Sequence, residues 1–387
     1  MLKNLFLLDP QVVYLNHGSY GACPRPVFAQ YQAWQRQLEL QPVQFLGIEL
    51  DNYMHHARNE LGEYLNASAS DLVYIPNATH GVNIVARSLQ LNPGDEVLST
   101  DQEYGACNFA WEFVCNKTGA LYKQQSIAIP VTSGEEIADQ FWRGVTPKTK
   151  IIFISHISSP TSLTMPIGMI CQRARQAGIL TLIDGAHAPG QMPVDLDAIQ
   201  ADFYVGNCHK WMLSPKGSGF IYARPEVQNL IEPLIVSWGY QSRFTNPHES
   251  RFIDYLQWSG TKDPSAALTV PTAIDFMKTN HWDDVRDACH LLLRLAMEQI
   301  CEITGLSPLY PLGSNFYHQM CTIPIPNVRD INELKTRLYT QYKIEIPCLE
   351  WNNHHFLRLS VQGYNTADDI EQLVNALRTL LPNMVAV

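Results

Sequence analysis

Two stretches decide the fold: Ile179-Leu-Thr-Leu-Ile-Asp184-Gly-Ala-His187 and Phe203-Tyr-Val-Gly-Asn207-Cys-His209-Lys210. Each begins with a short run of apolar and aromatic residues and ends in polar residues. A strand that is apolar throughout is typical of a parallel sheet with both faces covered by helices. The two stretches therefore predict an α/β fold that carries polar side chains at the ends of its strands.

The same pattern extends outward on both sides. From about Asp71 to Arg224, short apolar runs alternate with helical patterns, as in a sheet wound with helices on both faces. We expect strands at residues 71–75, 96–100, 121–127, 151–155, 179–184, 203–206 and 219–223. These segments predict a large domain built on a mostly parallel seven-stranded sheet.

After Pro264 the pattern changes to that of a smaller α+β domain. We expect helices at 283–302, 332–342 and from Thr366 to near the end, and strands at 319–325, near 345–347 and at 356–361. Thr366 with Asp369 three residues later is a start signal for the last helix. The expected parts are an N-terminal segment that packs on both domains, the large domain and the small domain, at residues 1–20, 21–263 and 264–387.

Composition excludes several classes of protein. Of 387 residues, 46% are hydrophobic and 17% are charged, which is too rich in core-forming residues for a disordered chain. The formal net charge is −10 and no basic run offsets it, so we expect no nucleic-acid partner. The longest uncharged stretch, 151–172, contains His156, Pro160 and Pro166, so we expect no membrane span.

Cysteine and histidine usage indicates a reduced compartment and no metal. The nine cysteines are odd in number and never spaced as Cys-x-x-Cys, which favours reduced thiols over disulfides or structural zinc. The histidine pairs 55–56 and 354–355 lack further ligands at metal spacing. The apolar run near the N-terminus is shorter than the core of a secretory signal. We therefore expect a cytoplasmic protein without a metal site.

Three polar groups follow expected strands: Asp184 to His187, Asn207 to Lys210, and Asn77 to Thr79. In open α/β sheets ligands bind beyond the carboxyl ends of the strands. Burial lowers the pKa of a lysine such as Lys210, so that its amine can form a Schiff base with a carbonyl, while Asp184 can pair with a cationic heterocycle. These are the two protein groups that a pyridoxal 5'-phosphate (PLP) site needs.

The phosphate of that cofactor needs hydrogen-bond donors, and the segment 77–79 opens an expected helix whose free N–H groups can bind an anion. Taken singly, each of these residues also has a structural interpretation, as a solvated loop lysine, a turn or cap residue, or a hydrogen-bonded histidine. No Walker loop, Gly-x-Gly-x-x-Gly or His-Glu-x-x-His motif is present. The occurrence of all three groups at strand ends favours the PLP site.

Longer motifs extend this interpretation over almost the whole chain. They lie at residues 14–21, 184–190, 206–211, 214–220, 258–264 and 357–365. With them the sequence resembles the class V aminotransferase family, PLP enzymes of the aspartate-aminotransferase fold that include cysteine desulfurases and selenocysteine lyases, and within it the isopenicillin N epimerase-like branch. The resemblance implies that Lys210 forms the Schiff base, Asp184 partners the pyridine nitrogen, His187 donates to the ring hydroxyl and Tyr104 stacks on the ring.

The resemblance also implies how phosphate and substrate are held. The implied phosphate ligands are Ala78, Thr79, Asn207, His209 and, from the other subunit, Thr261. The active form would then be a homodimer with shared sites. The implied residues around the amino-acid substrate are Arg358 for the α-carboxylate, Ser159, and Asn16 and His17 from an N-terminal loop. Alternation supports Arg358, because Leu357 and Leu359 take the opposite face of the expected strand.

The family's shared steps leave the reaction open. Lys210 would remove the α-proton, after which epimerisation, transamination or β-elimination can follow. Epimerisation needs an acid opposite Lys210, for which Tyr104 or the loop at 16–17 is a candidate. We expect an epimerase, racemase or aminotransferase, with a cysteine desulfurase or C–S lyase as the alternative. A non-catalytic PLP-fold binding or regulatory protein is the outside alternative.

One cysteine bears on these alternatives. Desulfurases use a mobile cysteine ahead of the carboxylate-binding arginine, and here the nearest candidate is Cys348. Its apolar, β-favouring flank, 344–347, predicts a strand rather than a mobile loop, which disfavours persulfide chemistry. The substrate itself stays undetermined, since side-chain specificity would lie in loops at 238–243 and 352–355.

Overall fold

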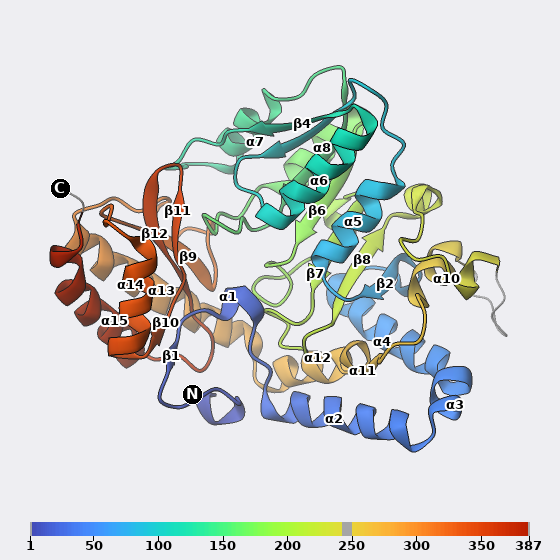
Figure 1. Ribbon diagram of the computed structural model, residues 1–387, viewed down its shortest axis with the longest axis horizontal. Coiled ribbons are helices and arrows are strands. Elements are labelled where there is room, and N and C mark those ends of the chain that lie inside the picture. Colours follow the sequence, from blue (N-terminus) through green and yellow to red (C-terminus); the bar gives the residue numbers. More distant parts are fainter. Residues whose placement is uncertain (1, 242–249, 386–387) are drawn as a thin grey trace.

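The structure, a computed structural model, describes residues 2–241 and 250–385 and is organised around a seven-stranded sheet (Figure 1). Its strand order is β2-β8-β7-β6-β5-β3-β4, with β8 antiparallel to both neighbours and all other pairs parallel. The strands are β2 (Leu72–Ile75), β3 (Glu96–Thr100), β4 (Leu121–Gln125), β5 (Thr149–Ser155), β6 (Leu180–Gly185), β7 (Phe203–Asn207) and β8 (Gly219–Ala223). All seven expected strands and the mostly parallel sheet are confirmed.

Each central strand is buried on both faces, as its apolar run predicts. In β6, Leu182 belongs to the core on one face and Ile183 to the core on the other, because successive side chains point to opposite faces. Helices that contribute to the Leu182 face are α5 (Ala78–Ser88), α6 (Gly105–Thr118) and α10 (Arg251–Gln257). Helices that contribute to the Ile183 face include α4 (Leu50–Leu65), α7 (Gly134–Trp142), α8 (Ile167–Gln176) and α12 (Val270–Thr279).

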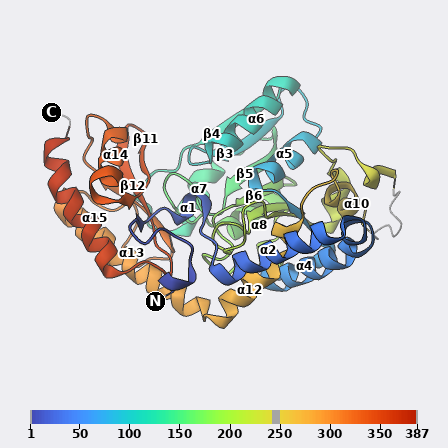
Figure 2. The ribbon, with the colours of Figure 1, turned by 60° about the horizontal axis from the view of Figure 1, so that its bottom comes forward.

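Further helices close the lower side of this layer. Helix α2 (Arg25–Leu40) lies beside α12, which in turn packs on α4 (Figure 2). The short helices are α3 (Pro42–Gln44), α9 (Leu196–Ile199) and α11 (Ser265–Leu268). Among the residues described, no helix has both the length and the apolar character that crossing a bilayer requires.

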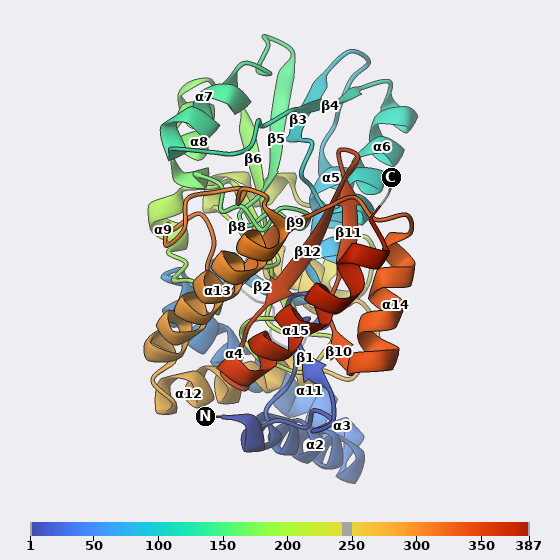
Figure 3. The same cartoon turned by 90° about the vertical axis from the view of Figure 1, so that its left-hand side faces the viewer.

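A second, antiparallel sheet follows in the C-terminal part, with strand order β11-β12-β9. Its strands are β9 (Met320–Ile325), β11 (Cys348–Trp351) and β12 (His354–Ser360). The helices α13 (Trp282–Thr304), α14 (Ile331–Tyr342) and α15 (Ala367–Leu380) lie along its outer side (Figure 3). The expected start of the last helix is confirmed, because Thr366 and Asp369 form a reciprocal capping box.

Two details of this part differ from the expected pattern. The strand expected near 345–347 is the two-residue β10 (Ile344–Glu345), which pairs with β1 (Val13–Tyr14) instead of the three-stranded sheet. The sequence predicts a strand at Cys348, but as part of the strand near 345–347. In the structure Cys348 begins the separate strand β11. Two left-handed residues, Asn352 and Asn353, turn the chain from β11 into β12.

The N-terminal segment runs between the two sheets, where α1 (His17–Tyr20) lies (Figure 1). The N–H of Leu15 donates to the carbonyl of Glu345, and the Leu15 carbonyl accepts from the N–H of Ser360. Residues far apart in sequence are thereby held beside the ends of β6 and β7.

Candidate active site

The structure brings the three predicted polar groups together at one edge of the large sheet. Asn207 ends β7, and its Oδ1 accepts a hydrogen bond of 2.9 Å from the N–H of Ala78, the first residue of α5. The Nζ of Lys210, three residues after β7, lies 3.3 Å from the Nε2 of His187. Asp184, near the end of the adjacent strand β6, completes the group.

Two glycines hold the loop that carries Lys210. Gly21 has φ +71°, and a Cβ there would lie 2.3 Å from the carbonyl oxygen of His209. Gly190 has φ +91°, and a Cβ there would lie 2.3 Å from the backbone of Trp211. Only glycine fits at both positions, since the backbones approach too closely for a side chain. The chain on either side of Lys210 is therefore fixed.

Burial gives Lys210 the ionisation that an amine nucleophile needs. Removal from water lowers the pKa of its amine to about 8, the nearby Arg358 guanidinium lowers the pKa further, and Asp184 partly offsets both. The free base of an amine is its nucleophilic form. The free-base fraction of Lys210 near neutral pH is therefore much larger than that of an ordinary lysine, although the ammonium form still predominates.

Asp184 is a buried carboxylate whose oxygens receive only neutral donors. Its Oδ1 accepts from the N–H of Ala186 at 2.9 Å and its Oδ2 accepts from the thiol of Cys107 at 3.6 Å. Within the described residues it forms no ion pair, and burial raises its pKa. A protonated pyridine nitrogen is the kind of cation that this carboxylate can receive, so Asp184 fits the PLP ring.

The first turn of α5 supplies donors suited to a phosphate. Asn77 caps the helix by accepting from the N–H of His80, and Asn207 takes the N–H of Ala78. Neither the N–H nor the hydroxyl of Thr79 has a hydrogen-bond partner in the part of the chain that the structure describes. A helix start with a free N–H and hydroxyl fits an anionic group.

The two remaining predicted phosphate ligands, His209 and Thr261, lie outside the first turn of α5. His209 donates its Nδ1 hydrogen to the carbonyl of Ser218 at 2.8 Å, which orients the imidazole beside β8. Thr261 is exposed and forms no hydrogen bond to any described residue of this chain. Within one chain, the structure does not bring Thr261 close to the other predicted phosphate ligands.

Arg358, on β12, is a buried guanidinium without an ionic partner among the described residues. Its Nη1 donates to the carbonyl and to the hydroxyl of Ser159 at 2.9 and 3.1 Å, and its Nη2 donates to the hydroxyl of Ser19 at 3.1 Å. Its side chain is 8% exposed, and burial lowers its pKa to about 10. All its partners are neutral, so its positive charge has no counter-ion among the described residues and can pair with an anionic ligand.

The N-terminal loop reaches Arg358 through Ser19. The hydroxyl of Ser19 donates to the Oδ1 of Asn16 at 2.5 Å, and the Nδ2 of Asn16 donates to Glu345 at 3.0 Å. His17 lies deeper and is fully buried. Its Nε2 hydrogen is donated to the carbonyl of Lys210 at 3.1 Å and its Nδ1 accepts from the hydroxyl of Tyr364 at 2.9 Å, so both ring nitrogens are satisfied within the protein.

Tyr104 precedes α6 and is 49% exposed, in contrast to Asp184, His187 and Arg358. The residue before it, Glu103, is buried and accepts hydrogen bonds from Ser155 and Thr100. Burial raises the pKa of Glu103 to about 7, and the neighbouring Asp184 adds to that rise.

Sequence reasoning missed four residues of this site. Ser19 and Glu103 gave no signal, because their roles depend on contacts with distant segments. Trp211 lies within the 206–211 motif, but nothing in the sequence indicated its contact with His187. Cys107 could have been found, because it follows Tyr104 by three residues, a spacing that places two side chains on one face of a helix.

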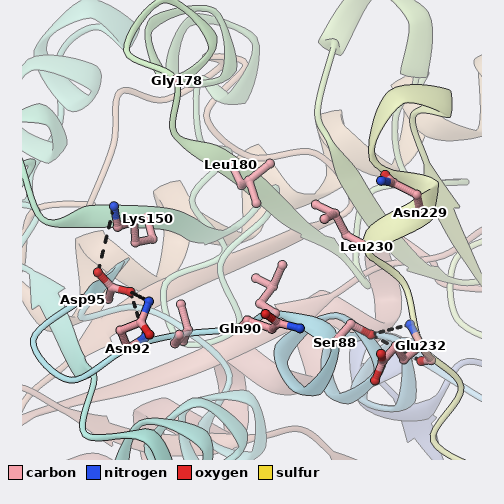
Figure 4. A pocket seen from close by; sticks show the side chains of 12 residues that line it. Ser88, Gln90, Asn92, Asp95, Lys150, Gly178, Leu180, Asn229, Leu230 and Glu232 are labelled. Carbon is pink, nitrogen blue, oxygen red and sulfur yellow. Dashed lines mark hydrogen bonds and ion pairs between the residues drawn. The ribbon is translucent and has the colours of Figure 1, made fainter.

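The cavity of about 560 Å³ shown in Figure 4 lies elsewhere. Its lining includes Lys150 at the start of β5 and Leu180 at the start of β6, so it opens at the amino ends of the strands. Lys150 is paired there with Asp95 across 4.0 Å. Since ligands of open α/β sheets bind at the carboxyl ends, this cavity is not the candidate site. In the described ranges no three His, Cys, Asp or Glu side chains are grouped to hold a metal ion.

Comparison with known proteins identifies the family. A family model described as aminotransferase class-V matches residues 13–373. An isopenicillin N epimerase from Amycolatopsis lactamdurans is 34% identical, with 96% of each chain covered. One from Streptomyces clavuligerus is 32% identical, covering 98% of this chain and 97% of the relative. A solved structure of a C-DES mutant with glycine covalently linked to its PLP cofactor has a TM-score of 0.82 at 19% identity, covering 96% and 97%.

Proposed function

The chain belongs to the class-V aminotransferase family of PLP-dependent enzymes, and from this premise we propose that it acts at the α-carbon of an amino acid through Lys210, Asp184 and Arg358. One observation carries the proposal. The buried Arg358 cation, whose partners are all neutral, lies in the same site as the Lys210 amine of lowered pKa. The family assignment sets aside the alternative of a non-catalytic binding protein.

When bound, the cofactor supplies an aldehyde for a lysine amine and a ring that accepts electrons from the α-carbon. Asp184 would hold the proton on the ring nitrogen, and His187 would donate to the ring hydroxyl. Tyr104, exposed at the start of α6, would stack on the ring. The proposed phosphate ligands are Ala78, Thr79, Asn207, His209 and the partner subunit's Thr261.

On the substrate side, Arg358 would bind the α-carboxylate through the fork of its guanidinium. Ser159 and Ser19 orient that fork, and Asn16 in turn holds Ser19. His17, bonded to the carbonyl of Lys210, supports the loop beneath the amine. The Lys210 amine, in its free-base form, would take the α-proton of the bound substrate as general base.

We propose epimerisation or racemisation as the outcome, on the strength of the isopenicillin N epimerases that match nearly the whole chain. Inversion requires a proton donor on the face opposite Lys210. Tyr104 is the candidate, because His17 has no free ring nitrogen. Transamination would use the same residues and would differ only in the atom to which the proton is returned.

The test is a screen of amino acids for exchange of the α-proton in deuterated water, with the products analysed for the opposite enantiomer, keto acid or pyruvate. We expect exchange with inversion for the wild type and none for Lys210→Ala. Tyr104→Phe should lose inversion and keep the cofactor. Unchanged racemase activity in Tyr104→Phe would refute its role, and exchange without Lys210 would refute the proposal as a whole.

The second candidate, desulfuration or C–S lysis, shares the fold and the first steps. Against persulfide chemistry, Cys348 is the first residue of β11 and pairs with Leu357, and burial raises its pKa to about 12. A thiolate is the nucleophile in such chemistry. β-Elimination needs no cysteine, so pyruvate among the products of the screen would favour it.

We further propose a cytoplasmic homodimer with shared sites. All nine cysteines are free thiols, as in a reducing compartment. Large apolar side chains stand exposed on α6 and near residue 238, namely Phe109, Phe113, Ile235, Val236, Trp238 and Tyr240. Such surfaces mark protein interfaces. Of the loops expected to set specificity, residues 238–241 form a 3-10 helix and 242–243 lie outside the described residues.

A further inference from the structure

Trp211, directly after Lys210, forms one hydrogen bond with a specific chemical consequence. Its indole nitrogen donates to the Nδ1 of His187 across 3.2 Å. The Trp211 side chain is fully buried and His187 is 5% exposed, so water does not compete for this contact. An indole N–H is a donor only, so Nδ1 must present its lone pair.

This bond decides which nitrogen of His187 carries the hydrogen. Burial holds the pKa of His187 well below its usual range, so the ring is neutral and has a single N–H. With Nδ1 occupied as an acceptor, that hydrogen is on Nε2. The Nε2 atom lies 3.3 Å from the Nζ of Lys210, which must therefore be the acceptor.

The lysine can accept only as a free base. An ammonium has three donors and no lone pair, so the protonated form of Lys210 would face the Nε2 hydrogen donor to donor. We propose that Trp211 is a positioning residue that locks His187 in its Nε2–H tautomer and thereby favours the unprotonated form of the Lys210 amine, which is the form that reacts with the aldehyde of the cofactor. This inference rests on the proposed function for the identity of that aldehyde.

Neighbouring groups hold the hydrogen bond between Trp211 and His187 in place. The Trp211 backbone is fixed against Gly190, and its ring lies 4.8 Å from that of His17. The charged and titratable groups that face Lys210 and His187 are Arg358 from β12, Asp184 from β6, Cys107 from α6 and His17 from α1. All remain when the indole N–H alone is removed.

The variant for the test is Trp211→Phe, with Trp111→Phe as matched control. Trp111 is also fully buried, but its indole nitrogen has no hydrogen-bond partner in the described structure. Incorporation of 3-benzothienylalanine at position 211 is the second variant, because it replaces the N–H by sulfur and keeps the shape of the side chain. It serves if Trp211→Phe does not fold.

The first readout is ¹⁵N NMR of histidine-labelled full-length protein, with and without cofactor, where His187→Gln assigns the signal. We expect a protonated Nε2 and an unprotonated Nδ1 at residue 187 in the wild type and in Trp111→Phe. Loss of the indole N–H should yield a tautomer mixture with protonated Nδ1. An unchanged Nε2–H tautomer in both position-211 variants would overturn the inference.

The second readout is the rate of cofactor uptake as a function of pH. We expect the midpoint to rise by about one pH unit in the position-211 variants, because His187 can then accept from the lysine ammonium. No change in the midpoint would overturn the link from Trp211 to Lys210. Borohydride reduction and peptide mapping separately identify the lysine that carries the cofactor. A lysine other than Lys210 would refute the proposed function, while the tautomer result would stand.

Discussion

Arg358 and Asp184 are both buried and form no ion pair within the described residues. Burying a charge without a partner costs several kcal/mol, and a folded protein retains such a charge where a ligand supplies the opposite one. At the scale of single residues, the site thus holds two uncompensated charges, which the cofactor and the substrate would neutralise under the proposed function.

For this reason we expect Arg358→Met to stabilise the cofactor-free protein while abolishing substrate binding. The gain in the free energy of unfolding should be about 1–4 kcal/mol, the range found when buried ion pairs are replaced by apolar groups of similar volume. Denaturant titration and amino-acid titration of the loaded enzyme measure the two effects. The exposed Arg378→Met is the control and should change neither. A clear loss of stability in Arg358→Met would contradict this view of the site.

Glu103 gives a pH dependence of definite sign. Burial raises its pKa from the ordinary value of 4.5 to about 7. Between these values the folded chain keeps a proton that the unfolded chain releases, so the contribution of Glu103 to stability is full below pH 4.5 and is lost as pH rises through 7. A glutamine at position 103 is neutral at every pH and lacks this pH-dependent contribution.

The melting temperature of Glu103→Gln, relative to that of the wild type, should therefore rise between pH 5 and pH 8. Thermal melts across this range measure it. Glu112→Gln, on the exposed side of α6, should show no such trend. A relative melting temperature that stays flat or falls with pH would show that Glu103 is ionised throughout.

At the scale of elements, the start of α15 depends on its capping box. Thr366→Ala removes the acceptor for the N–H of Asp369 and should cost about 1 kcal/mol of stability. Thr379→Ala on the same helix is the control, since that exposed hydroxyl only bonds back to Asn375, and it should stay within about 0.5 kcal/mol. Equal losses in the two variants would show that the box contributes nothing.

Strand β11 makes a prediction about chemistry. Because Cys348 is paired in a sheet and its thiol is held protonated, Cys348→Ala should leave α-proton exchange within about twofold of the wild type. Sulfur release from cysteine, if the enzyme shows any, should be equally unaffected. Loss of sulfur transfer in Cys348→Ala would instead identify the chain as a cysteine-dependent desulfurase.

At the scale of the whole molecule, the proposed shared sites can be tested by complementation. Lys210→Ala removes the amine and Thr261→Glu places a negative charge where the partner's phosphate would lie. Each variant alone should be inactive. When equal amounts of the two variants are mixed and their subunits exchange, about a quarter of the wild-type activity should return. Half of the dimers are then mixed, and each mixed dimer holds one intact site out of two. No recovery despite subunit exchange would exclude a shared site.

The sequence predicted the sheet well because buried strands carry a local signal. The runs at 179–184 and 203–206 are apolar throughout, and the ends of both strands were placed within about a residue. Asp184 and Lys210 could be named for the same reason, as polar residues at the ends of such runs.

Contacts between distant segments have no comparable local signal in the sequence, so they could not be predicted. Ser19 meets Arg358 across 339 residues, and Trp211 meets His187 through the packing of two strand-end loops. Strand β1 is defined only by pairing with β10. The domain boundaries at 20 and 263 remain predictions. So does the role of Thr261, which requires a second subunit.

The pairing of β1 with β10 also has a consequence for how the protein is made. Residues 13 and 14 leave the ribosome long before their partners at 344 and 345 have been translated. The nascent large sheet can assemble once residue 223 has emerged, whereas the loop with Asn16 and Ser19 has no partners until Glu345 and Arg358 have been made. A translation product truncated before β10 can thus form the large sheet and still lack the residues proposed to bind the substrate.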